Sequence, residues 1–141
     1  MNRNARKWIK ALRSGKYRQG SGALATVELD IGAKKPETHY CCLGVACDLA
    51  IKAGIKVSVK KYQDNVLFGR QKYFLPKRVR VWLGLSTERG HFTRKQEDET
   101  NLADMNDEGC SFKEIAATIE QEPEGLFQVV KKKTAKKRKA V

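Results

Sequence analysis

The first apolar positions of the chain follow the period of a helix. Over residues 4–15 the apolar side chains take the i, i+3, i+4 and i+7 spacing that places them on one helical face. These positions are Ala5, Trp8, Ile9 and Leu12. Asn4 can cap the start of this helix, and Gly15 suits the left-handed position just past its end. The pattern predicts an amphipathic helix that turns its apolar side to the core.

Farther along, apolar and polar residues alternate with the period of two that is typical of strands. Residues 23–31 alternate in this way and place four apolar side chains on one face. They are Ala25, Val27, Leu29 and Ile31. Residues 55–62 repeat the alternation, and residues 66–74 can supply one or two more short strands. The pattern predicts several short strands that pair through turns.

Helical signals return between and after these strands. Residues 39–41 predict a short strand that runs into a helix over residues 43–53, which Gly54 closes. A second helix is expected over residues 75–85, with Pro76 at its first position, where the missing N–H costs nothing. Each of these helices follows a predicted strand, so the two kinds of element are mixed along the chain.

The last third of the chain is more polar. Residues 86–98 show no period and predict a polar loop, whereas residues 100–107 can form a short helix. Ser111 and Glu114 make the Ser-x-x-Glu pattern of a capping box, which opens a helix over residues 112–121. Residues 125–131 are expected to form a final strand. We therefore predict an α+β fold of short helices packed on a small, mostly antiparallel sheet.

The chain is long enough for one domain with a substantial core, since it holds 141 residues. We place this domain at residues 1–130 and expect residues 131–141 to be a disordered basic tail, because they offer almost nothing to bury. No apolar run approaches the ~20 residues of a membrane span, so no membrane association is expected. The clustered cysteines do not resemble a secretory disulfide framework and favour a reducing, intracellular setting.

Charge is unevenly distributed along the chain. Residues 1–87 hold 18 Lys or Arg against 5 Asp or Glu, residues 88–124 hold 4 against 11, and residues 125–141 hold 7 against none. This asymmetry points to an anionic partner, either nucleic acid or a nucleotide, although a merely solvated surface is the alternative. The candidate contacts are Lys7, Lys10, Arg13, Tyr17 and Arg18, with Lys132, Lys133, Lys136, Lys137 and Arg138 of the tail.

Several aromatic residues lie among Arg and Lys residues along the chain. They are Tyr17, Tyr62, Phe68, Tyr73 and Phe74. Aromatic and cationic side chains together can stack on bases and neutralise phosphates, although the same residues can also be half buried in a sheet. The sequence does not decide between these two interpretations.

The stretch THYCCLGVACD, residues 38–48, suggests a catalytic site with a cysteine nucleophile. Cys41 and Cys42 stand where a strand meets a helix, and such a helix start can stabilise a thiolate. His39 or His91 would have to serve as the base. The alternative is that the thiols are small apolar side chains of the core, as cysteines often are. We favour the core interpretation and keep a cysteine-dependent hydrolase or transferase as the alternative.

Metal sites are not supported by the spacing. The cysteines are spaced C-C and C-x₄-C, Cys110 is far along the chain, and there is no second knuckle of the C-x₂₋₄-C kind that zinc sites use. Ile115 stands where a calcium loop starting at Asp104 needs its Glu. No metal and no cofactor are therefore predicted. Asn106 and Asp107 remain candidates for hydrogen-bonding groups in a polar pocket.

Four stretches of the sequence resemble small proteins encoded by tailed bacteriophages and prophages. They are WIKALRSGKYRQGSGAL, YCCLGVACDLA, LPKRVRVWLGL and LADMNDEGCSFKEIAATIE. In those proteins a Trp-x-x-Ala-Leu-Arg-Ser-Gly start, a Cys-Cys-Leu-Gly-Val helix and a Leu-x-x-x-Asn-Asp segment follow in the same order. The resemblance covers residues 8–120 and implies a phage accessory gene that acts in a bacterial cytoplasm, but no particular activity. The basic tail is not part of that pattern.

Together these observations predict a non-enzymatic phage accessory protein that binds an anionic partner through a basic surface. The partner would be nucleic acid, or a nucleotide signal that the protein sequesters as a counter-defence. A further alternative is a protein–protein inhibitor of a host factor that uses the acidic residues 97–108. The sequence leaves the oligomeric state open.

Overall fold

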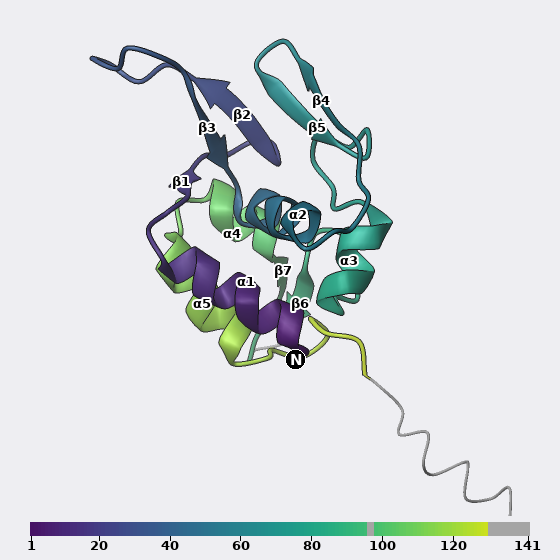
Figure 1. The fold of residues 1–141 in the computed structure, drawn as a ribbon. Coiled ribbons are helices and arrows are strands. Elements are labelled where there is room, and N and C mark those ends of the chain that lie inside the picture. The colour runs from purple at the N-terminus through teal and green to yellow at the C-terminus, as the bar shows by residue number, and fades with distance from the viewer. Residues whose placement is uncertain (96–97, 130–141) are drawn as a thin grey trace, which may run out of the picture.

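In the part of the chain that the structure describes, five short helices form a body, and a sheet stands on one side of it (Figure 1). The computed structural model describes residues 1–95 and 98–129. Its helices are α1 (Arg3–Arg13), α2 (Cys42–Lys52), α3 (Lys77–Leu83), α4 (Leu102–Asp107) and α5 (Phe112–Glu120). Its strands are β1 (Arg18–Gln19), β2 (Ala25–Glu28), β3 (Glu37–Tyr40), β4 (Val59–Tyr62), β5 (Asn65–Phe68), β6 (His91–Thr93) and β7 (Glu99–Asn101). The predicted α+β fold, with helices on a mostly antiparallel sheet, is confirmed.

The main sheet has the strand order β1-β3-β2-β5-β4. Only the short β1–β3 pair is parallel. The hairpins β2–β3 and β4–β5 are joined to each other by just two residue pairs, Ala25 with Val66 and Thr26 with Asn65. Beyond these pairs the hairpins extend away from the helices as two separate arms (Figure 1).

Only the base of this sheet packs on the helical body. Ala25 and Phe68 are buried at the base, whereas all four residues of β4 are exposed. The predicted strand over residues 23–31 is therefore too long, because β2 ends at Glu28 and the later apolar residues lie in solvent. Ile31 is fully exposed and Leu29 is 63% exposed, since no second layer covers the arm at that point.

Helix α2 lies at the centre of the body and is buried over most of its first three turns. Helix α1 packs its predicted apolar face, Trp8 included, against α2 and α5. Its cap differs from the prediction, because the side chain of Asn2 accepts the N–H of Ala5 while the Asn4 amide donates to the carbonyl of Trp82. At α5 the predicted capping box is present, with Ser111 and Glu114 bonding each other's backbone N–H.

Two predictions for the last third of the chain are wrong. Residues 86–98 were expected to be a loop, but residues 91–93 form β6 and pair with β7 in a small second sheet. Strands of three residues are too short to show a period. Conversely, residues 125–129 form no strand within the described part of the chain, where Phe127 makes only an isolated bridge to Leu85.

Candidate functional site

The cysteine-rich stretch forms a sealed junction between β3 and α2. Cys41, Cys42 and Cys47 are all buried. A close backbone approach makes the junction tight, because a Cβ added to Gly44 would lie only 1.8 Å from the carbonyl oxygen of Leu24. The small residues of the Cys-Cys-Leu-Gly-Val segment thus allow the first turn of α2 to pack directly on the chain entering β2.

Three of the recognisable sequence segments meet at Cys42. The indole Nε1 of Trp8 donates to the Cys42 carbonyl at 2.8 Å, and the Cys42 N–H donates to Asn106 Oδ1 at 3.2 Å. The Cys42 thiol faces the Leu102 carbonyl at 3.5 Å. Since Cys41 offers no side-chain cap, Asn106 supplies the cap of α2 from α4. We call Trp8, Cys42, Gly44, Leu102 and Asn106 the motif junction.

The thiols of this junction are held in their neutral form. Burial raises the pKa of Cys41 to about 11 and raises the pKa of Cys42 and of Cys47 as well. A nucleophilic cysteine needs the opposite shift, toward the thiolate. Thus the start of α2, where the sequence suggested an activated thiol, instead protects these thiols from ionisation.

Neither histidine is oriented toward a thiol. His39 lies against two carboxylates, with Nδ1 at 3.8 Å from Glu28 and Nε2 at 3.5 Å from Asp30. His91 lies on β6, where Nε2 is 3.8 Å from Glu99. The structure therefore brings each predicted base next to acidic groups rather than next to Cys41 or Cys42.

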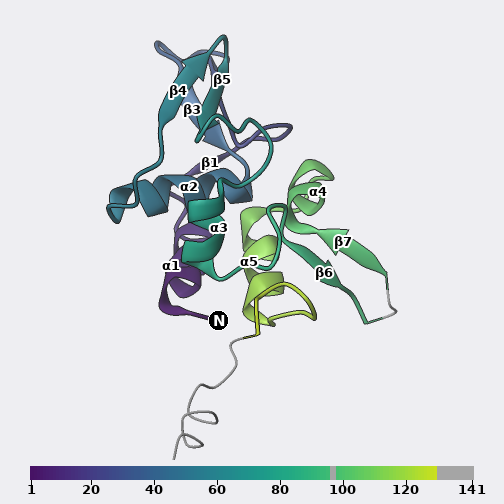
Figure 2. The same cartoon turned by 90° about the vertical axis from the view of Figure 1, so that its right-hand side faces the viewer.

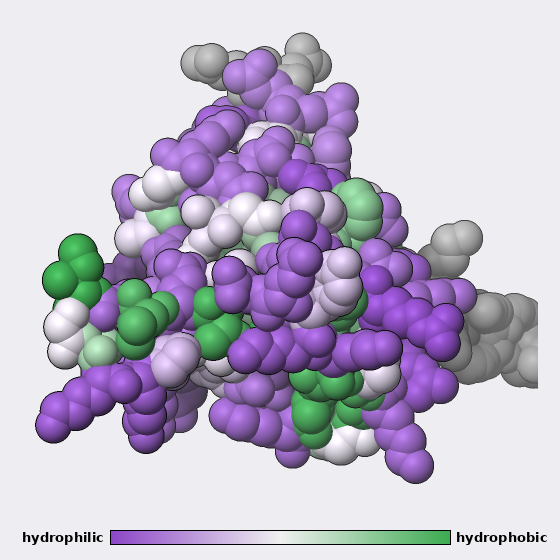
Figure 3. Space-filling view, turned by 90° about the horizontal axis from the view of Figure 1, so that it is seen from above, coloured by the Kyte–Doolittle hydropathy of each residue, from purple (hydrophilic) through white to green (hydrophobic). Residues whose placement is uncertain are grey.

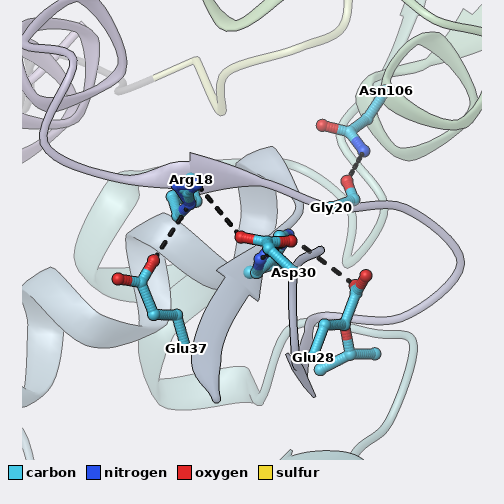
Figure 4. A network of polar contacts seen from close by, with 8 residues as sticks. Arg18, Gly20, Glu28, Asp30, Glu37 and Asn106 are labelled. Carbon is cyan, nitrogen blue, oxygen red and sulfur yellow. Dashed lines mark hydrogen bonds and ion pairs between the residues drawn. The ribbon is translucent and has the colours of Figure 1, made fainter. Parts of the chain in front are cut away.

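Asn106 and Asp107, the predicted pocket residues, hold the segment that leads from β1 to β2. Asn106 donates to the Gly20 carbonyl at 2.7 Å (Figure 4). It also accepts from the Gln19 side chain at 2.9 Å. Asp107 accepts the N–H of Gly22 at 2.9 Å. Asn106 lines a shallow hollow of about 390 Å³ together with His39, whereas Asp107 is not among the residues that line it. The polar atoms of Asn106 are already engaged by the protein itself.

Arg18, a predicted anion contact, is neutralised within the protein. Its guanidinium lies 3.0 Å from Asp30 and 3.0 Å from Glu37, and Figure 4 shows it between these two carboxylates. Because both carboxylates would compete with an incoming phosphate, Arg18 is a poor anion contact. It serves instead to join β1 to the β2–β3 arm.

The remaining candidates on and after α1 divide into two groups. Lys7 and Lys10 are exposed, and no acidic side chain of the described residues lies within ion-pair distance of them. Arg13 instead makes a two-point contact with Glu120 on α5. Tyr17 donates its hydroxyl to Asp48 and packs edge-on against Tyr40, so its ring is fixed within the protein. The five tail candidates lie outside the described residues.

Folding converts the charge asymmetry of the sequence into two sides of the molecule. Residues 49–87 carry nine Lys or Arg and only one acidic residue, Asp64. In Figure 2 the elements of this segment, together with α1 and α2, lie to the left, and β6, β7 and α4 lie to the right. The right-hand elements come from the acidic segment, residues 88–124. We call the left-hand side, with α1, α2, α3 and the β4–β5 arm, the basic half.

The acidic segment itself is partly engaged in internal contacts. Asp104 accepts from Arg89 at 2.8 Å and from the amide of Asn101, and Asp107 is bound to Gly22. Carboxylates that hold the fold in this way are less available to a protein partner. The structure therefore adds nothing in favour of an acidic inhibitory surface.

Sequence reasoning missed the cations on and beside α3. Lys77 and Arg78 fall within the predicted helix over residues 75–85 but were not singled out, yet both line hollows in the surface of the basic half. The signal that could have found them is the density of cations and aromatics over residues 60–80, almost free of acids. Within residues 1–95 and 98–129 no group of three His, Cys, Asp or Glu is arranged to hold a metal ion.

Comparison with protein families places the chain in one of them. A family model described as Domain of unknown function (DUF8296) matches residues 1–123, so the chain belongs to this family. Comparisons with the curated proteins and with the solved structures found no match. No helix among the described residues is long and apolar enough to cross a membrane.

Proposed function

We propose that this member of the DUF8296 family is a non-enzymatic accessory protein that binds nucleic acid through its basic half. The observation that carries the proposal is the separation of charge in the folded molecule, with nine cations and one acid over residues 49–87. A surface of one sign attracts a polyanion and gains affinity as each phosphate contact releases counterions. The resemblance to small phage proteins supports a place in the cytoplasm of a bacterial host.

The cations of the basic half are exposed, which supports their use toward a partner. Lys7, Lys10, Lys56, Lys60, Lys61 and Lys77 are all exposed. Among the residues that the structure describes, none of these six has an acidic side chain within ion-pair distance. By contrast Arg13, Arg18 and Arg89 are paired with carboxylates. The available charge is thus lysine-rich and extends over several elements.

The extent of this surface favours a polymer over a single nucleotide. The exposed lysines come from α1, from the segment between α2 and β4, from the β4–β5 arm and from α3 (Figure 1). A mononucleotide would touch only a few of them, whereas a nucleic acid backbone can reach many. The hydroxyl of Tyr17 is bound to Asp48 and its ring contacts Tyr40, so the predicted stacking residue for a nucleotide is already engaged.

Salt titration of DNA and RNA binding tests this proposal. We expect the affinity to fall steeply as salt rises from about 50 mM to about 200 mM, as is typical of a protein with several phosphate contacts. Reversing charge with Lys7→Glu and Lys10→Glu should weaken binding about tenfold or more at low salt. Free nucleotides at equal phosphate concentration should not compete.

A matched control is offered by Lys113, an exposed lysine on α5 within the acidic segment. Lys113→Glu changes the charge of a single exposed lysine on α5, outside the basic half, and should weaken binding much less. A variant that ends at residue 130 measures the share of binding due to the basic tail. The proposal is wrong if neither the full chain nor this variant binds DNA or RNA at low salt.

A further inference from the structure

Two hollows flank the start of α3 and share one lysine. The first, about 430 Å³, is lined by Phe74, Lys77 and Arg80 among others, and we call it the Phe74 hollow. The second, about 620 Å³, is lined by Lys56, Lys77, Arg78, Val81 and Trp82, and we call it the Trp82 hollow. Each hollow therefore combines an aromatic residue with cations, and Lys77 borders both of them.

Phe74 in the first hollow is exposed, whereas Trp82 in the second hollow is half-buried. Among the described residues, the exposed large aromatics are Tyr62, Tyr73 and Phe74. Seen from above, the apolar side chains at the surface form separate small patches on a mostly hydrophilic face (Figure 3). Patches of this kind are too small for an obligate protein interface, but a single ring is large enough to stack on a base.

The rings are held in place by cations. Lys72 lies 5.0 Å from the centre of the Tyr73 ring, and Arg89 lies 5.6 Å from the centre of the Phe74 ring. Arg89 is fixed in turn by its ion pair with Asp104. Phe74 remains 38% exposed, so one side of the ring is supported while part of it faces solvent. A ring fixed in this way loses little freedom when a base stacks on it.

The charges around the hollows suit a phosphate backbone. Glu88 is the one acidic residue that lines either hollow, against Lys56, Lys77, Arg78 and Arg80. The guanidinium groups of Arg78 and Arg80 are anchored by carbonyl oxygens, those of Lys56 and Leu85. Each guanidinium has five N–H donors, so donors remain for a phosphate after this contact.

We propose that the basic half recognises single-stranded nucleic acid, with bases in the Phe74 and Trp82 hollows and the intervening phosphate on Lys77. This proposal rests on the proposed function and names its substrate. Bases paired in a duplex are stacked on each other and cannot enter such hollows, whereas the bases of a single strand can. Single strands should therefore bind more tightly than duplexes of equal charge.

The test compares an oligothymidylate of about 15 nucleotides with a duplex of equal length and with an abasic oligomer of the same charge. We expect the single strand to bind the full chain about tenfold more tightly than either competitor at moderate salt. Tryptophan fluorescence gives a second readout, because Trp8 is fully buried and Trp82 lines its hollow. The single strand should quench this fluorescence and the abasic oligomer should not.

Phe74→Ala should weaken single-strand binding about tenfold, and Phe74→Trp should restore it, because a stacked base contributes about that much affinity. Duplex binding should be the same in both variants. Tyr62→Ala, which removes an exposed ring from the far end of the β4–β5 arm, serves as the control. Lys77→Ala should weaken binding of single strands more than Lys113→Ala does.

Three outcomes would overturn the inference. If single strand and duplex bind equally and Phe74→Ala changes neither, stacking is absent and only the general nucleic-acid function survives. If nothing binds at low salt, the proposed function and this inference are both wrong. If a polyglutamate peptide quenches Trp82 as strongly as the oligonucleotide, and Phe74→Ala abolishes that effect, the surface belongs to an acidic protein partner.

Discussion

The motif junction and the two hollows beside α3, the Phe74 hollow and the Trp82 hollow, differ in how accessible their functional groups are. The junction contains the most distinctive residues of the chain, yet its thiols are buried and its Asn106 is bound to three protein groups. The hollows take their cations largely from the stretch LPKRVRVWLGL, and they are open and combine these cations with aromatic rings. Distinctive residue types are required where backbones approach closely, whereas a surface for a polyanion requires only the right charges and a few accessible rings.

The largest effect on stability is expected from adding one methyl group to the motif junction. Gly44→Ala places a Cβ 1.8 Å from the carbonyl oxygen of Leu24, a backbone atom that cannot move aside easily. We expect a loss of about 3 kcal/mol or more in the free energy of unfolding, measured by urea denaturation.

Gly15→Ala is the control, because Gly15 adopts a positive φ of 77°, unlike the helical Gly44, and has no atom near its missing side chain. It should cost only about 1 kcal/mol, from the left-handed backbone alone. Equal losses in the two variants would show that the close approach to Leu24 is not what Gly44 provides.

A smaller effect is expected at the polar side of the junction. Asn106→Ala removes the cap of α2 and leaves the Cys42 N–H and the Gly20 carbonyl without their partner. Since Asn106 is only 3% exposed, we expect a loss of about 2–3 kcal/mol in the free energy of unfolding. Hydrogen exchange should also become faster at the amide of Cys42.

Asp107→Ala is the comparison for this site. Asp107 is exposed and holds only the N–H of Gly22, so its loss should cost about 1 kcal/mol or less. If Asn106→Ala were no more harmful than Asp107→Ala, the Asn-Asp segment would have to be explained by a ligand instead of by the fold.

The smallest predicted effect concerns the pH dependence of stability. Burial raises the pKa of Cys41 to about 11 from 9.0, so the folded state keeps this proton where the unfolded state loses it. The stabilisation is complete below pH 9.0 and is lost as pH rises toward about 11. Between about pH 8 and about pH 10, the unfolding free energy should fall by about 1 kcal/mol less in Cys41→Ala than in the unmodified chain.

Thiol labelling complements this measurement. In the native protein Cys110, which is only partly buried, should react first, and the three buried cysteines should react only after denaturation. Rapid labelling of native Cys41 or Cys42 at neutral pH would contradict the sealed junction and revive the cysteine-dependent enzyme.

Much of the fold follows from local pattern, and the exceptions have physical causes. The helices α1, α2, α3 and α5 were predicted because their apolar spacing or their caps are local signals. The extension of β2 to Ile31 was wrong because alternation alone does not show whether a second layer covers the strand. The β6–β7 pair was missed because three-residue strands depend on partners elsewhere in the chain.

The candidate site was predicted less well than the fold. Asn106 and Asp107 were found, but their role in holding the Gln19–Gly22 segment depends on contacts more than 80 residues apart in sequence. Arg13 and Arg18 were grouped with Lys7 and Lys10 as anion contacts, although ion pairs occupy the two arginines. Sequence shows the charge of a side chain but not whether a carboxylate already neutralises it.

The sequence by itself determined the fold class, the preference of the thiols for the core and the separation of charge into segments. These properties depend on composition and on short-range periodicity, and neither of these requires a contact between distant parts of the chain. Only the tertiary structure decided that three motifs meet at Cys42, that the charged segments become opposite sides, and that Phe74 and Trp82 lie on either side of Lys77. Those features arise from packing between distant segments, whose geometry no local pattern encodes.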